Sequence, residues 1–184
     1  MDFLRHLFSH ICGQVNCWHA GGVVSAACQR CTGLYIGALV AAIAFVTFRP
    51  RPTSRSLWLH GIAMLLMLPF GYHLVPQSTV VRAITGQLFG YGMSFYLLLL
   101  PADRFDFWCT GIPTISSVWY LISLITAIPV ILLGATSGSP LAVTALSYLA
   151  FAGLMSVTYL ISWNALILLA TAWGAVSTRM SGTA

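Results

Sequence analysis

Five residues near the N-terminus are suited to holding a metal ion. Two residues separate Cys28 from Cys31, so both thiolates of one helical turn can reach a single ion. Further sulfur and nitrogen donors lie about ten to sixteen residues upstream, which is within the range of small zinc sites. The sequence therefore predicts a zinc site with the candidate ligands Cys12, Cys17, His19, Cys28 and Cys31.

The same thiols leave other interpretations open. An oxidising compartment would favour disulfides, and four thiolates would suffice for an iron–sulfur cluster. Cys28 and Cys31 would also serve as a dithiol that exchanges electrons with a quinone or thiol partner. A c-type haem is disfavoured, because Thr32 follows Cys31 where that site requires histidine. The side of the membrane discriminates between the two main alternatives, since outside favours disulfides and inside favours zinc.

The composition is that of a membrane protein. Of 184 residues, 59% are hydrophobic and only 6% are charged, whereas a soluble domain carries about 25% charged residues. The eight basic residues are all arginine and the three acids are aspartate, so the net charge of +5 is mainly a lack of acid. Such a balance fits lipid headgroups, and no basic stripe suggests nucleic-acid binding. The sequence contains no nucleophile–base–acid set that would indicate catalysis. It also has no acidic residue within a predicted span that would indicate proton-coupled transport.

Apolar runs of about twenty residues recur, and each is long enough to cross a bilayer. We expect an all-α polytopic transmembrane helical bundle below an amphipathic, Cys/His-rich cap over 1–31, with the bundle over 32–178 and a tail over 179–184. About six spans are predicted, with five as the alternative: 32–48, 56–75, 80–100, 115–134, 141–161 and 164–178. The last two are separated because one helix would be about 57 Å long, against a hydrocarbon core of about 30 Å. The polar break between them is Ser162, Trp163 and Asn164.

Two pairs of glycines, each four residues apart, lie in the first and third predicted spans. Small residues at this spacing share one helix face and let two backbones approach closely in lipid. The pairs predict that these two helices pack together or against a partner: Gly33 with Gly37, and Gly86 with Gly90.

His60 is an ionisable residue within the second predicted span, where such residues are often functional. No histidine on another span would complete a six-coordinate haem, so His60 would serve as a single axial ligand to a chlorophyll-type pigment or a haem. A histidine near a membrane edge needs no cofactor, and that interpretation stays open.

Two stretches of the sequence read CQRCTGLYIG over 28–37 and STVVRAITGQLFG over 78–90. They resemble a widespread group of small bacterial multi-pass membrane proteins classified only as a domain of unknown function. The resemblance covers about residues 10–100 and implies a cysteine pair before the first span. The family usually has a Cys-His pair upstream, where this chain has Cys12 and Gly13, so Cys17 or His19 would have to replace one ligand. The matching residues are Cys28, Arg30, Cys31, Thr32, Gly33, Tyr35 and Gly37, then Ser78, Arg82, Thr85, Gly86 and Gly90.

These observations favour a non-catalytic protein of the bacterial inner membrane. We expect an accessory or structural subunit that packs against other membrane subunits of a larger complex, such as one of energy conversion or electron transfer. The competing hypotheses are a membrane thiol or quinone redox protein using Cys28 and Cys31, and a pigment- or haem-binding subunit using His60.

Overall fold

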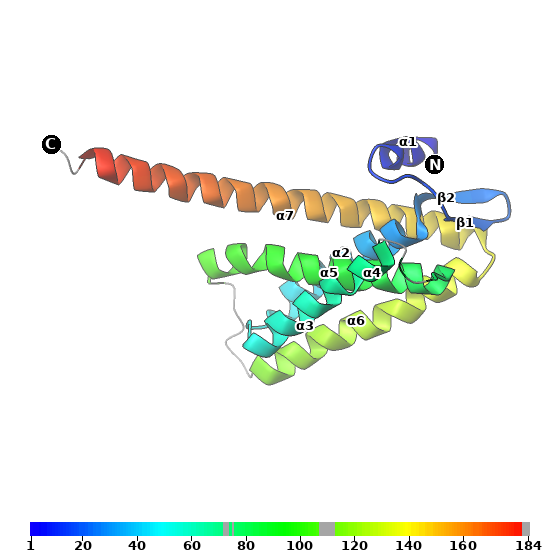
Figure 1. Cartoon of the computed structure of the whole chain (residues 1–184), viewed down its shortest axis with the longest axis horizontal. Helices are drawn as coiled ribbons and strands as arrows, with labels where there is room; N and C mark the ends of the chain where they lie inside the picture. The colour runs from blue at the N-terminus through cyan, green and yellow to red at the C-terminus, as the bar shows by residue number, and fades with distance from the viewer. Residues whose placement is uncertain (72–73, 75, 107–112, 182–184) are drawn as a thin grey trace.

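The computed structural model describes residues 1–71, 74, 76–106 and 113–181, and within this part the chain is mainly helical (Figure 1). The predicted all-α bundle with a small N-terminal cap is confirmed. The end of the predicted span 56–75 and the last residues of the predicted tail lie outside the described residues. The elements are α1 (Asp2–Ser9), β1 (Cys17–Ala20), β2 (Val23–Cys28), α2 (Gln29–Phe48), α3 (Ser54–Leu65), α4 (Met67–Gly71), α5 (Thr79–Arg104), α6 (Pro113–Thr136) and α7 (Pro140–Ser181).

Helices α2 and α5 lie against each other with almost no side chain between them. A Cβ atom placed on Gly33 would overlap the carbonyl oxygen of Ala83, and one on Gly37 would overlap that of Gln87. The same holds in reverse, because Gly86 and Gly90 meet the carbonyl oxygens of Arg30 and Leu34. Four residues along α2 correspond to four residues along α5, so the two helices run parallel. These are the two glycine pairs for which the sequence predicts close packing.

Because α2 and α5 are parallel, the chain between them must return to the end where it started. The return is made by α3 and α4, whose last turn accepts a hydrogen bond at Phe70 O from Arg30 Nη2, 2.9 Å away. The two helices are separated at Leu66, because Pro69 has no N–H to donate to the carbonyl of Leu65. Together they cover residues 54–71, about 27 Å of helix, which is close to the thickness of the hydrocarbon core.

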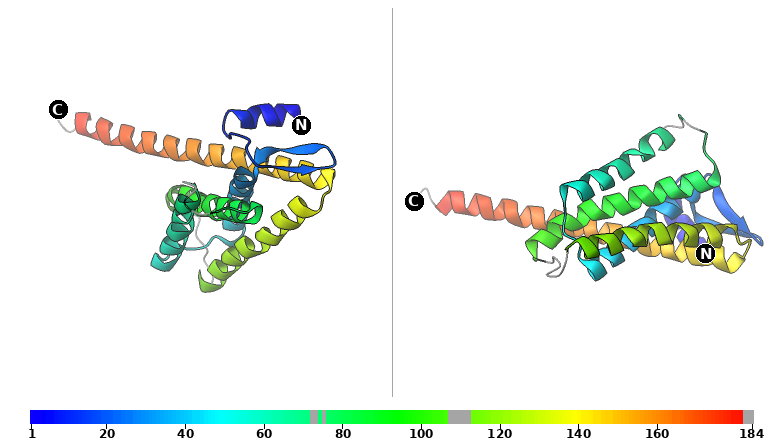
Figure 2. Two further views of the ribbon diagram at one scale, coloured as in Figure 1. Left: turned by 45° about the vertical axis from the view of Figure 1, so that its right-hand side comes forward. Right: turned by 90° about the horizontal axis from the view of Figure 1, so that it is seen from below.

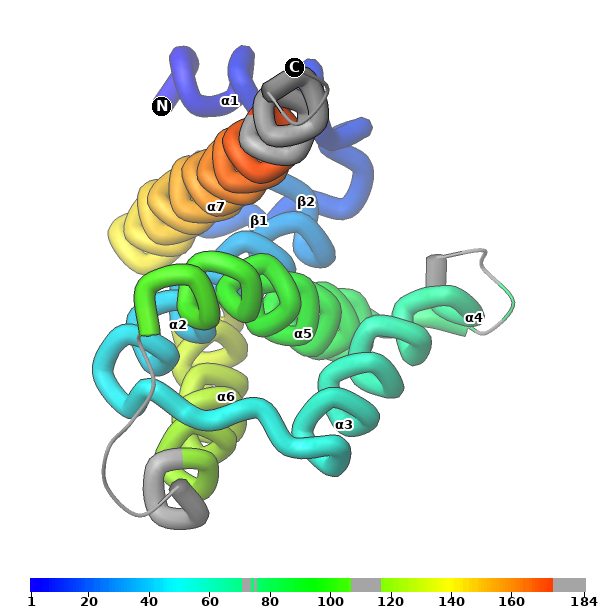
Figure 3. Tube along the Cα trace, turned by 90° about the vertical axis from the view of Figure 1, so that its left-hand side faces the viewer, coloured from blue at the N-terminus to red at the C-terminus, as the bar shows by residue number. Residues whose placement is uncertain are grey.

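Four of the described helices are long and apolar enough to cross a membrane by themselves: Gln29–Phe48, Thr79–Arg104, Ser117–Thr136 and Pro140–Trp173. The broken pair α3–α4 adds a fifth pass along the bundle. Within the part of the chain that the structure describes, the arrangement thus agrees with the alternative of five passes. Figure 3, which looks along the bundle, shows α5 between α7 and α6, with α3 and α4 beside it.

The expected break between spans 141–161 and 164–178 is wrong, since α7 is one helix through this region. Asn164 explains why the polar residues do not end the helix. Its Nδ2 donates to Leu160 O in the preceding turn and to Leu97 O of α5, at 2.8 and 2.7 Å. Trp163 contacts Phe105 at the end of α5, with ring centroids 5.9 Å apart. Beyond this point α7 extends past the rest of the bundle (Figures 1 and 2).

The cap is built from α1 and a two-stranded antiparallel hairpin, β1–β2, which the sequence analysis did not foresee. Gly21 and Gly22 form its turn with positive φ values of 51° and 80°. The hairpin lies on the start of α7, where Ala26 N donates to Ser147 Oγ at 3.1 Å. As expected, α1 is amphipathic, and it buries Leu4 and Phe8 against the hairpin and α2. The cap is therefore fixed to one end of the bundle.

Replacing Gly90 by alanine should destabilise the bundle, because the new Cβ would lie 3.0 Å from Leu34 Cα and closer still to its carbonyl group. We expect a loss of at least about 1–3 kcal/mol, the usual cost of overpacking. Thermal unfolding of the purified protein in detergent measures this loss.

Gly134→Ala is the matched control, because its Cβ would meet nothing nearer than Leu146 Cδ1 at 3.5 Å. Both substitutions gain the same helix propensity, so the difference between them isolates the contact of α2 with α5. Equal unfolding midpoints for the two variants would contradict this packing.

Candidate metal centre

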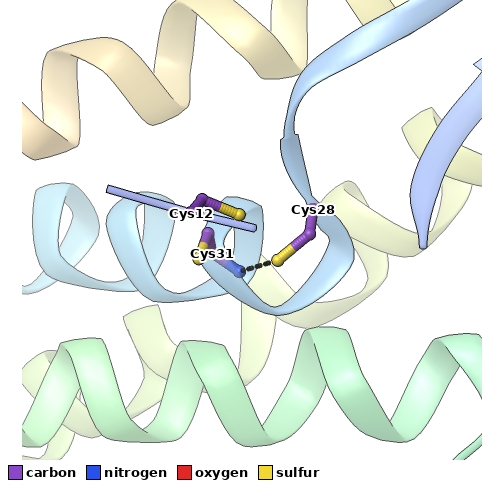
Figure 4. Close-up of side chains that lie close together, drawn as sticks. All are labelled: Cys12, Cys28 and Cys31. Atoms are coloured by element: carbon purple, nitrogen blue, oxygen red, sulfur yellow. Dashed lines mark hydrogen bonds between the residues drawn. The ribbon is translucent and has the colours of Figure 1, made fainter. Parts of the chain in front are cut away.

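Three cysteines meet where the cap joins the bundle (Figure 4). The Sγ atoms of Cys12, Cys28 and Cys31 all lie within 4.8 Å of one another. Three thiolates on one tetrahedral zinc ion, at Zn–S distances of about 2.3 Å, would be separated by about 3.8 Å. Small side-chain rotations therefore suffice to bring the three sulfurs onto one ion.

Cys28 and Cys31 are placed by the junction of β2 with α2. Cys28 is the last residue of the strand and the N-cap of the helix, and its Sγ accepts a hydrogen bond from Cys31 N at 3.5 Å. The spacing of two residues puts both sulfurs on the first turn of α2, as the sequence predicted. The backbone of this turn is held from outside by Asn16, whose carbonyl accepts from Gln29 N at 3.1 Å.

Cys12 reaches the pair from the loop that follows α1. Its N–H still bonds to Phe8 O at 2.7 Å, so it continues the last turn of that helix. Gln14 then fixes the loop, because its Nε2 donates to Arg5 O at 2.6 Å and to Ala26 O at 3.1 Å. Sequence reasoning missed this role of Gln14, since no local pattern marks an amide that bridges a helix to a strand.

The other two predicted ligands, Cys17 and His19, are not in the cluster. Cys17 lies opposite Cys28 in the hairpin, but its Sγ donates to Gln14 O at 3.1 Å. His19 is exposed on the same strand and lies opposite Val24. The β1–β2 pairing sets both positions, and it was not foreseen, so the fourth ligand is not supplied by either residue in this conformation.

The three thiols are electrostatically unequal. The pKa of Cys12 is lowered to about 2, because its thiolate accepts hydrogen bonds from the thiols of Cys28 and Cys31. The same hydrogen bond to Cys12 is the main cause that raises the pKa of Cys28. Burial raises the pKa of Cys17, which lies outside the cluster. Without a metal, the three thiols form one hydrogen-bonded group, in which Cys12 is the acceptor and loses its proton most readily.

His60 lies at a different place, deep between α3 and α5. Its Nδ1 is 2.6 Å from Ser56 O, and since a carbonyl only accepts, Nδ1 carries the proton. The ring is 1% exposed and stacks on Phe95 at a centroid distance of 3.9 Å, with Tyr91 and Tyr120 around it. The Nε2 atom is buried and has no hydrogen-bond partner among the described residues, so a haem or pigment would reach it only if neighbouring side chains moved.

The chain was compared with known proteins. The model of an uncharacterised family, "Predicted membrane protein (DUF2085)", matches residues 12–96. The resemblance to an uncharacterised membrane protein family is thereby confirmed. The matched segment contains the three clustered cysteines, His60 and the α2–α5 contact. No curated protein and no solved structure gave a significant match.

The unequal thiols predict how alkylation of the reduced, metal-free protein depends on pH. At pH 6, below the ordinary thiol pKa of about 8.5, Cys12 is already a thiolate and Cys17 is not. The rate of Cys12 alkylation by iodoacetamide should therefore be nearly flat between pH 6 and 8, while the Cys17 rate rises about tenfold per unit. Peptide mass spectrometry follows both sites in one sample.

A variant with both Cys28→Ala and Cys31→Ala provides the control, because it removes the two thiol donors to the Cys12 thiolate, which have the largest effect on its pKa. Its Cys12 profile should rise with pH as that of Cys17 does. A steep Cys12 profile in the unmodified protein would contradict the charge distribution described here.

Proposed function

We propose that this is a non-catalytic, multi-pass membrane protein whose cap is tied to the bundle by one zinc ion on Cys12, Cys28 and Cys31. The observation that carries the proposal is the meeting of three sulfurs from two separate segments within 4.8 Å. An ion at this point would join the loop after α1 to the first turn of α2. Such cross-links stabilise small caps that have little hydrophobic core of their own.

The donor set favours zinc over the other metals considered. Thiolates select soft or borderline ions, and an iron–sulfur cluster requires four protein thiolates where the cluster gathers three. Zinc accepts three protein ligands with a fourth position left to an external group.

A disulfide is the main competing interpretation, and the distribution of arginines between the two ends of the bundle supports it. With five passes, the positive-inside rule places the cap on the outer side of a bacterial inner membrane. A disulfide would use two of the three sulfurs and leave one thiol unpaired, whereas an ion uses all three. The arginines at the end away from the cap are Arg49, Arg51, Arg55, Arg104 and Arg179, against Arg5, Arg30 and Arg82 at the cap end.

Purified protein should contain about one zinc ion per chain by elemental analysis. Cys12→Ser and Cys31→Ser should lose most of the metal and unfold at lower temperature, because each removes one of three ligands. Cys17→Ser is the matched control, since it removes a neighbouring thiol outside the cluster, and its zinc content should be unchanged.

The thiol count separates the two interpretations. All five cysteines should react with a thiol reagent after unfolding with a chelator and without a reductant. A protein that carries no metal and shows two fewer thiols would refute the zinc centre in favour of a disulfide.

A role as a subunit of a larger membrane complex is the second candidate, and α7 supports it. The segment of α7 after Asn164 begins beside the end of α5 and carries apolar side chains that are largely uncovered: Leu166, Leu168, Leu169 and Trp173 are 61%, 58%, 67% and 76% exposed. A helix segment that is apolar on all sides is stable only when lipid or another protein covers it. We infer that a partner membrane helix covers this segment.

A photo-crosslinking residue at Leu169 should give one discrete product with another chain in native membranes. Ile125 on α6 is a suitable control, because it lies in another candidate span and is equally exposed, at 66% against 67% for Leu169. If the Leu169 variant yields no more product than the control, and the protein migrates alone on native gels, the subunit role is wrong.

A further inference from the structure

A cleft of about 360 Å³ opens beside the three cysteines. One wall is the loop 11–16, and the other is formed by the starts of α2 and α5. This position is the junction between the cap and the membrane-spanning helices, so the cleft lies at the depth of the lipid headgroups. Its lining includes three polar side chains that the metal centre does not use, Gln29, Arg30 and Arg82.

The two arginines bring positive charge that no carboxylate balances. Both are half-buried, and none of the three acids of the chain, Asp2, Asp103 and Asp106, lines the cleft. Among the described residues, Arg30 Nη2 donates to two neutral acceptors, the carbonyl oxygen of Phe70 and the side-chain oxygen of Gln77. Cys12 lines the same cleft and its thiolate offsets one of the two positive charges, so an anion from outside the chain would stabilise the remaining one.

Two buried polar atoms in residues that line the cleft have no hydrogen-bond partner among the described residues. The Nε of Arg30 is a donor and the Oε1 of Gln29 is an acceptor, and neither has a hydrogen bond among the described residues. Gln29 is only 7% exposed, so its amide is not satisfied by open solvent. An unpaired donor and an unpaired acceptor on two lining residues indicate a ligand that offers both kinds of group.

The backbone adds a field of the same sign. Because α2 and α5 are parallel, both helices begin at this end of the bundle. The first-turn N–H groups of Cys31 and Val81 are already bonded to the side chains of their N-cap residues, so the helix dipoles rather than free N–H groups favour negative charge here. Arginine is the side chain best matched to a phosphate, since its planar group donates two parallel hydrogen bonds.

We propose that this cleft binds a phosphate group, with Arg30 and Arg82 contacting the phosphate oxygens and Gln29 accepting a hydrogen bond from a hydroxyl on the ligand. A phospholipid headgroup such as phosphatidylglycerol and a free phosphate share this chemistry. The site does not require the zinc ion. A zinc ion with three thiolates carries one net negative charge, so the two arginines leave one positive charge for a monoanion.

The test uses the full-length protein, purified and delipidated in a maltoside detergent without phosphate. Two probes are titrated separately and followed by ³¹P NMR and native mass spectrometry: dihexanoyl phosphatidylglycerol and inorganic phosphate. We expect saturable binding of one or both, weakened about tenfold or more in Arg82→Gln, because one charged hydrogen-bonding group is lost. Arg55→Gln at the opposite end of the bundle removes the same charge and should bind as the unmodified protein does.

The two probes distinguish the sources. Binding of the lipid alone identifies a headgroup site, and binding of inorganic phosphate with displacement of the lipid identifies a site for free phosphate. Arg82→Lys keeps the charge and should retain part of the affinity, which covers the case in which Arg82→Gln fails to fold.

The proposal is overturned if neither probe binds the unmodified protein, or if Arg82→Gln and Arg55→Gln bind equally well. Zinc content measured on the same samples keeps this result separate from the fate of the metal centre, since phosphate binding is expected with or without the ion.

Discussion

The backbone contact between α2 and α5 is the interaction on which the rest of the structure depends. Gly33, Gly37, Gly86 and Gly90 remove the side chains from both faces, so the carbonyl groups of one helix lie against the glycines of the other. In lipid there is little hydrophobic gain from bringing helices together, and close van der Waals packing takes its place. Because the two helices are parallel, this one contact also brings the first turns of both to the same end of the bundle.

The parallel arrangement then dictates what the remaining elements do. The chain must return between the two helices, and α3–α4 makes that return in two pieces because Pro69 interrupts it. The return ends where Arg30 donates to Phe70 O, so the start of α2, the end of α4 and the start of α5 share one junction. Polar side chains inside the bundle serve as bridges between helices, as Asn164 does between α7 and Leu97 O.

The sequence predicted those features that depend on local spacing. Glycines four residues apart gave the packing faces, and the two-residue spacing of Cys28 and Cys31 gave two sulfurs on one helical turn. The predictions that did not hold concern features that depend on contacts between distant segments. Cys17 and His19 were separated from the other ligands by a hairpin whose pairing no local pattern marked, and α7 remained unbroken because Asn164 finds its partner on another helix.

The thiol cluster and the cleft place groups of opposite charge close together at the junction of the cap and the bundle. The junction gathers sulfurs that carry negative charge and arginines that carry positive charge, yet the arginine Arg30 bonds to neutral acceptors and leaves the thiols to one another. If the arginines served only to balance the thiolates, we would expect ion pairs between the guanidinium groups and the cysteines. The separation of the two sets leaves the thiols available to a cation and the guanidinium groups available to an anion. It also means that the loop 11–16, which borders both, would be held by either ligand, so that the cap is fixed to the bundle by what it binds as much as by what it buries.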